Sequence, residues 1–134
     1  MIKKIDHLGL AVKDLDETVK FYKESFGLDV EKTEDFQGFK IAFIPVGNAE
    51  LELLQDTNPE GAIAKYIERR GEGIQHVAFE VDNIEEALKE AKAKGITLID
   101  EKPRPGANNT TVGFLHPKST HGVLIEFVKR PSHD

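Results

Sequence analysis

Two histidines and two glutamates in this chain belong to the residue types that bind divalent metal ions, and all four interrupt apolar sequence. His7 and His76 each begin a run of alternating apolar residues, whereas Glu52 and Glu126 each lie between two large apolar neighbours. Imidazole nitrogen and carboxylate oxygen suit Zn, Co, Ni, Mn and Fe(II), and coordination geometry selects among these ions. Four such ligands leave two positions of an octahedral ion open for a substrate that offers two oxygens. The sequence therefore predicts one divalent metal site that contains all four side chains.

An internal repeat relates the two histidines and the two glutamates. Residues 5–12 realign on residues 74–81 with an offset of 69, the spacing between His7 and His76, and no gap is needed through the following helix. The two glutamates occupy matching places in the last strand expected of each copy. A single histidine in a strand is usually a structural polar residue, and a single glutamate usually faces solvent. Because the His and Glu recur together in both copies, we favour metal ligands over these two interpretations.

Both copies predict the same order of elements. Each begins with a period-2 strand that turns its apolar row to the core and its histidine to the opposite face. A helix follows, which begins at the capping residues Asp14 and Asn83 and ends near Gly27 and Gly95. The remaining expected elements are strands, apart from one short connecting helix at Gly61–Arg70: Asp29–Glu34, Phe39–Val46, Glu50–Gln55, Ile96–Glu101, Thr111–Leu115 and Val123–Lys129.

These elements predict an α+β fold in which two tandem βαβββ modules form a curved mixed sheet around a metal-binding cleft. At 134 residues the chain suits a single domain, 1–134. Within it we place module 1 at about 1–57, a connector at about 58–72 and module 2 at about 73–134.

Composition excludes several classes of protein. Apolar residues make up 39% of the chain and charged residues 31%, a balance typical of soluble globular proteins. The net charge of −6 and the lack of a basic stripe argue against nucleic-acid binding. No apolar run approaches a membrane span of about 18 residues, and the start does not resemble a signal peptide, so a cytoplasmic protein is expected. Zero cysteines exclude disulfides and thiolate ligands.

The chain resembles the vicinal oxygen chelate (glyoxalase-like) superfamily and, within it, the methylmalonyl-CoA epimerases. The paired modules, with histidines on first strands and acids on last strands, carry the first resemblance. The second rests on an ordered set of motifs spread over nearly the whole chain: Ile5–Val12, Glu52–Leu54, Pro59–Tyr66, Arg70–His76, Pro103–Ala107, His116–Ser119 and Gly122–Glu126.

This resemblance implies an isomerase, a racemase or epimerase that interconverts the R and S forms of methylmalonyl-CoA by α-proton transfer through a metal-stabilised enolate. It implies Co as the cofactor, with Zn, Ni or Mn as alternatives, and a homodimer. By the same resemblance Glu126 is both a ligand and a proton-transfer group, whereas Ile41 stands where some relatives carry a second catalytic Glu. The second acid or base is therefore open, with Glu52 or a metal-bound water among the options.

Several polar residues outside the repeat have two open interpretations. Arg104, Lys118 and Ser119 lie in predicted loops near the cleft, where they either contact the CoA phosphates and thioester arm or are solvated loop residues. The remaining histidines have no counterpart in the first copy and are predicted to be surface residues: His116, His121 and His133.

Other functions of the same fold compete with the epimerase. A glyoxalase-type lactoylglutathione lyase uses the same kind of metal centre on a glutathione hemithioacetal. An extradiol dioxygenase needs Fe(II) with fewer protein ligands and is usually longer. A metal-free, resistance-type protein that sequesters small molecules has no need of the four ligands, so metal analysis separates it from the enzymes.

Overall fold

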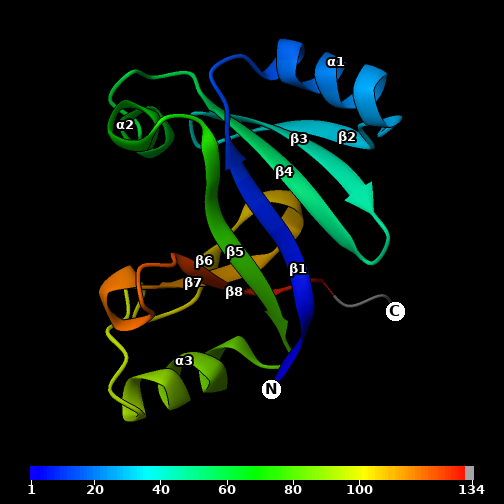
Figure 1. Cartoon of the computed structure of the whole chain (residues 1–134). Coiled ribbons are helices and arrows are strands. Elements are labelled where there is room, and N and C mark those ends of the chain that lie inside the picture. Colours follow the sequence, from blue (N-terminus) through cyan, green and yellow to red (C-terminus); the bar gives the residue numbers. More distant parts are fainter. Residues whose placement is uncertain (132–134) are drawn as a thin grey trace. The chain divides into compact units, whose positions relative to one another are not determined.

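Two βαβββ modules follow one another along the chain, as the sequence predicted (Figure 1). The computed structural model describes residues 1–131, and His133 lies outside the described residues. The first module contains β1 (Ile2–Ala11), α1 (Leu15–Phe26), β2 (Lys32–Phe36), β3 (Phe39–Val46) and β4 (Ala49–Asp56). Helix α2 (Ala62–Arg70) leads to the second module, which contains β5 (Gly73–Val81), α3 (Ile84–Ala93), β6 (Arg104–Pro105), β7 (Thr111–Leu115) and β8 (Ile125–Lys129). Among the described residues, none of the helices has the length and apolar character needed to cross a membrane.

Both modules use the same mixed strand arrangement. The order is β2-β3-β4-β1 in the first module and β5-β8-β7-β6 in the second. The first and last strands of each module run parallel, and the other neighbours within each module are antiparallel. Parallel neighbours require a long crossover connection, which contains the module's helix. This pairing puts the strand that carries the histidine beside the strand that carries the glutamate.

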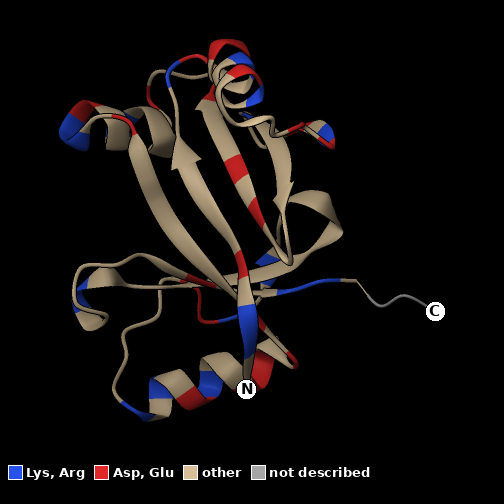
Figure 2. Cartoon of the chain, turned by 45° about the vertical axis from the view of Figure 1, so that its right-hand side comes forward, with Lys and Arg blue, Asp and Glu red and all other residues tan. Residues whose placement is uncertain are grey.

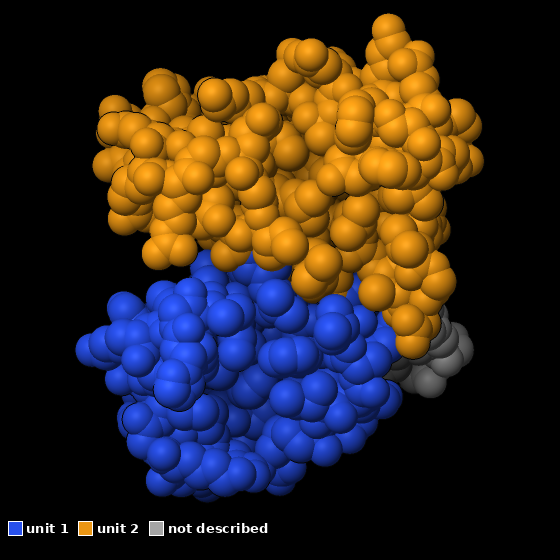
Figure 3. Space-filling view, in the orientation of Figure 1, with its two compact units in different colours: residues 1–6, 76–134 blue, residues 7–75 orange. Residues whose placement is uncertain are grey.

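The described chain divides into two compact units, coloured separately in Figure 3. One unit contains residues 7–75, and the other contains residues 1–6 together with the chain from residue 76 onward. The divisions therefore fall immediately before His7, within β1, and immediately before His76, within β5. The single domain and its module boundaries, as placed from the sequence, stay predictions.

The capping signals found in the sequence begin both long helices. The Asp14 carboxylate accepts the backbone N–H of Glu17 at 3.0 Å, and the Asn83 side chain accepts that of Glu86 at 3.1 Å. Helix α1 ends at Gly27, whose φ of 70° is left-handed and suits glycine. Both α1 and α3 carry Lys residues interspersed with Asp or Glu along their length (Figure 2).

Each helix packs its apolar stripe on the strand face opposite the histidine. In the unit of residues 7–75, α1 packs on a core that includes Val12, Leu15 and Leu53. In the other unit, Leu88 of α3 packs on the apolar side chains of Val81 and Phe127. Within each module, strand alternation leaves the opposite face of the strands for the His and Glu side chains.

The predicted strand at Ile96–Glu101 is wrong. Within this segment only Leu98 forms a bridge to Leu115, and the short strand β6 lies later, at Arg104–Pro105. The reason is that Asp100 interrupts the ladder: its carboxylate accepts the N–H of Phe114 at 2.8 Å, in place of a backbone carbonyl. Strand β2 is also later than the predicted Asp29–Glu34.

Candidate metal centre

The first-module histidine and glutamate lie together on buried strands. His7 on β1 is 4% exposed and Glu52 on β4 is 9% exposed. Nδ1 of His7 lies 3.1 Å from Oε2 of Glu52. In the β1–β4 register Gly9 is the partner of Glu52, so the small glycine leaves room between the two side chains. The sequence prediction that these residues share a face is confirmed.

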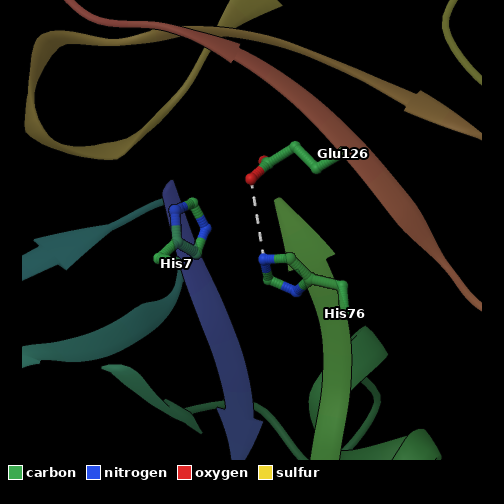
Figure 4. Close-up of side chains that lie close together, drawn as sticks. All are labelled: His7, His76 and Glu126. Carbon is green, nitrogen blue, oxygen red and sulfur yellow. Dashed lines mark ion pairs between the residues drawn. The ribbon is translucent and has the colours of Figure 1, made fainter. Parts of the chain in front are cut away.

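The second module repeats the arrangement with His76 on β5 and Glu126 on β8, as Figure 4 shows. Nε2 of His76 lies 3.6 Å from Oε1 of Glu126, and both residues are 6% exposed. Beside this pair, Ala78, Val112 and Val128 form a buried apolar cluster, and Phe114, the strand partner of Glu126, packs against it. The low dielectric of such a setting strengthens each polar interaction within it.

The donor atoms of both pairs fit a divalent ion. Two atoms that each lie about 2.1 Å from one ion, at a right angle, are about 3.0 Å apart. The observed separations, 3.1 Å in the first module and 3.6 Å in the second, are close to that value. Each module therefore offers one nitrogen and one oxygen ligand in suitable proximity.

Phe114 is a site residue that the sequence did not indicate. Its ring centroid lies 5.5 Å from that of His76, with the rings nearly perpendicular, and Phe114 is the strand partner of Glu126. The Arg104 guanidinium lies 5.3 Å from the same ring centroid. Asp100 holds Arg104, because the Arg104 Nε–H donates to its carboxylate at 3.0 Å. The alternation of Val112 and Phe114 against Gly113 was the signal that could have placed Phe114 on the glutamate face.

The three predicted substrate contacts are in different settings. Of the three, Arg104 lies near the His76–Glu126 pair, because its guanidinium and the His76 ring both lie against the ring of Phe114. Ser119 accepts the backbone N–H of Thr97 through its hydroxyl at 2.9 Å, so this side chain supports the loop. Lys118 is exposed in a short 3-10 helix at Pro117–Ser119.

A buried ion pair lies in the unit that contains the second module. Asp6, which is 1% exposed, accepts two hydrogen bonds from Arg130: from Nε at 2.6 Å and from Nη2 at 3.0 Å. The pair joins the residue before His7 to the residue after β8. Two parallel hydrogen bonds fix the position of both chain segments.

Comparison with known proteins places the fold and the motifs in one family. The sequence profile of the Glyoxalase/Bleomycin resistance protein/Dioxygenase superfamily matches residues 6–114. The mitochondrial methylmalonyl-CoA epimerase of Dictyostelium discoideum is 34% identical over 132 residues, which cover 96% of this chain and 80% of that protein. The chain belongs to the methylmalonyl-CoA epimerase family of this superfamily.

Solved structures agree with this membership. A methylmalonyl-CoA epimerase in complex with methylmalonyl-CoA and NH4+ is 34% identical with a TM-score of 0.94, covering 98% of this chain and 97% of that chain. The lactoylglutathione lyase of Haemophilus influenzae is less similar, 26% identical over 131 residues that cover 96% of this chain and 94% of that protein. The fold class and the epimerase resemblance predicted from the sequence are confirmed.

Proposed function

We propose that this protein is a methylmalonyl-CoA epimerase that interconverts the R and S forms of its substrate, and that His7, Glu52, His76 and Glu126 together bind one divalent metal ion. The observation that carries the proposal is the repetition of a buried His–Glu pair in both modules of a chain that belongs to the epimerase family. The donor set suits Co, Zn, Ni or Mn, and Co is our choice by family resemblance. When bound, the ion supplies a Lewis acid for the carboxylate and thioester oxygens of the substrate.

Glu126 is the proposed proton-transfer residue of the second module. Glu126 is buried, and its strand partner is Phe114, so water has little access to a proton transferred there. Because a carboxylate has two oxygens, one can bind an ion while the other accepts the α-proton of the substrate.

Arg104 is the proposed contact for an anionic group of the substrate. Its guanidinium is held by Asp100 and by the ring of Phe114, and its planar fork suits phosphate or carboxylate oxygens. Lys118 and Ser119 complete the proposed CoA-binding loops, with Lys118 as an exposed point charge. As the family resemblance implies, we further propose a homodimer. The cytoplasmic location stays a prediction from the sequence.

Deuterium exchange tests the function directly. In heavy water, the metal-loaded protein is expected to incorporate deuterium at the α-carbon of methylmalonyl-CoA and to convert each epimer into the other. Mass spectrometry and chiral analysis measure the two results, and removal of metal by a chelator should abolish both. Exchange that persists at full rate in metal-free protein would contradict the proposed centre.

Replacement of His76 by Ala tests the ligand set. We expect His76→Ala to lower the bound metal from about one ion per chain to a small fraction, because one of four ligands is lost, while circular dichroism stays unchanged. His121→Ala is the matched control, since His121 is an exposed histidine in the same unit. Elemental analysis of both variants gives the answer, and equal metal content in the two would remove His76 from the site.

A lactoylglutathione lyase activity is the second candidate, because the Haemophilus influenzae enzyme matches nearly the full chain. Both reactions transfer a proton next to a carbonyl group, so the ligands alone do not separate them. Turnover of the hemithioacetal of methylglyoxal and glutathione, without exchange on methylmalonyl-CoA, would favour this candidate.

A further inference from the structure

Inversion of a carbon centre requires proton transfer on both faces of the substrate, so Glu126 needs a counterpart. This inference rests on the proposed function. Ile41 has no titratable group and cannot serve. The first module carries the other half of the proposed metal centre, and its strand registers identify the titratable groups on the same face.

Edge strand β2 contributes two charged side chains to the face of Glu52. Cross-strand partners point to the same face of a sheet. Phe43 on β3 is the partner of Glu52, and Lys32 on β2 is the partner of Phe43. Two residues along the same strands, Glu34 is the partner of Ile41. Lys32 and Glu34 therefore share the face that carries the first-module ligand.

Buried apolar side chains separate Glu34 from Glu52. Ile41, Phe43 and Leu54 are 3%, 1% and 7% exposed, and the registers place all three on this face. Neighbouring strands are about 4.8 Å apart, so β2 lies about 10 Å from β4. A glutamate side chain and a small acyl group together span such a distance, and the apolar strip suits the methyl group of the acyl chain.

Among the charged residues of this face that are not proposed metal ligands, Glu34 is better enclosed than Lys32. Its side chain is 26% exposed, against 47% for Lys32, whose Nζ lies 3.9 Å from the Glu34 carboxylate and 5.7 Å from the Phe43 ring centroid. Glu50 also shares the face and is half-buried, but its partner Pro45 is exposed beside the turn that joins β3 to β4. Proton transfer to carbon favours the group that is more shielded from water.

We propose that Glu34 is the second proton-transfer residue of the epimerase and the functional counterpart of Glu126. In one direction the Glu34 carboxylate removes the α-proton and becomes a carboxylic acid, and the C–H electron pair passes into the enolate. Protonated Glu126 then delivers its proton to the other face of the carbon and becomes a carboxylate. The reverse direction exchanges the two roles, and solvent resets the protonation states between turnovers.

Separate exchange measurements on the two epimers test this assignment. For Glu34→Gln, we expect the rate of epimerisation to fall at least 100-fold. The rate of deuterium exchange should fall by the same factor with one of the two epimers. Exchange with the other epimer, which Glu126 deprotonates, should stay within about threefold of wild type. Asp35→Asn is the matched control, because it removes the same charge from the opposite face of β2 and should leave both rates unchanged.

Other outcomes would overturn the assignment. Equal loss with both epimers, or loss of metal from Glu34→Gln, would make Glu34 structural. Epimer-specific loss in Glu50→Gln or Lys32→Met, with Glu34→Gln unaffected, would move the role to that residue. If Glu34→Gln does not fold, Glu34→Asp retains the charge and should show the same epimer-specific decrease. Failure of the proposed function itself is distinct, since the wild-type protein would then exchange neither epimer.

Discussion

Glu126→Gln is expected to lower α-proton exchange on one epimer of methylmalonyl-CoA by about 10²- to 10⁴-fold, the usual contribution of a general base. The glutamine retains an oxygen that can bind a metal ion, but its amide does not accept a proton at neutral pH. Because Glu126 is buried among apolar side chains, water is poorly placed to replace it. Exchange measured by mass spectrometry, with metal content measured on the same sample, separates the two roles of the side chain.

The control for this variant is Glu80→Gln. Glu80 lies on the same strand as His76, is half-buried, and pairs in register with Val128. Its replacement removes the same charge from the same unit and is expected to change exchange by less than about twofold. An unaltered exchange rate in Glu126→Gln would exclude this residue as the base, even if metal binding were weakened.

The second large effect is on stability, through the buried ion pair between Asp6 and Arg130. Arg130→Met removes both hydrogen bonds to a carboxylate that is 1% exposed. Removal of one partner from a buried pair costs about 3–5 kcal/mol, and the partial exposure of Arg130 favours the lower end. We expect the free energy of unfolding to fall by about 3 kcal/mol and the melting temperature to fall by about 10 °C.

Two comparisons make the stability prediction specific. Lys3→Met breaks an exposed ion pair with Asp82 in the same unit and is expected to cost less than about 1 kcal/mol. In the double variant Asp6→Leu/Arg130→Met neither charge of this pair is left, so much of the lost stability should return. Chemical denaturation measures all three proteins, and equal stability of Arg130→Met and Lys3→Met would refute the argument.

The pairing of each histidine with a glutamate could be predicted because strand alternation and the repeat act locally. An apolar residue on either side of Glu52 or Glu126 fixes the face of the glutamate, and a parallel first and last strand in each module brings it beside His7 or His76. The caps at Asp14 and Asn83 are equally local, since each depends on one side chain and an N–H three residues away.

Contacts between distant side chains had no such local signal. Asp6 and Arg130 are separated by 124 residues, and nothing in either segment indicates the other. Arg104 and His76 both contact Phe114, but only the register of β7 with β8 puts this ring beside Glu126. The segment around Asp100 was mistaken for a strand because its apolar pattern is that of a strand. In the structure the Asp100 carboxylate, and not a backbone carbonyl, accepts the N–H of Phe114.

The division of the chain before His7 and before His76 has a consequence for a single copy of the repeat. Strand β1 begins in the unit that contains the second module and continues, from His7, in the unit of residues 7–75. Strand β5 begins in the unit of residues 7–75 and continues, from His76, in the other unit. Neither half of the sequence therefore contains a whole unit. Each unit includes the first residues of a strand that belongs to the other half of the sequence. We therefore expect a single copy, produced as a separate chain, to complete its fold only by exchanging these residues with a second molecule.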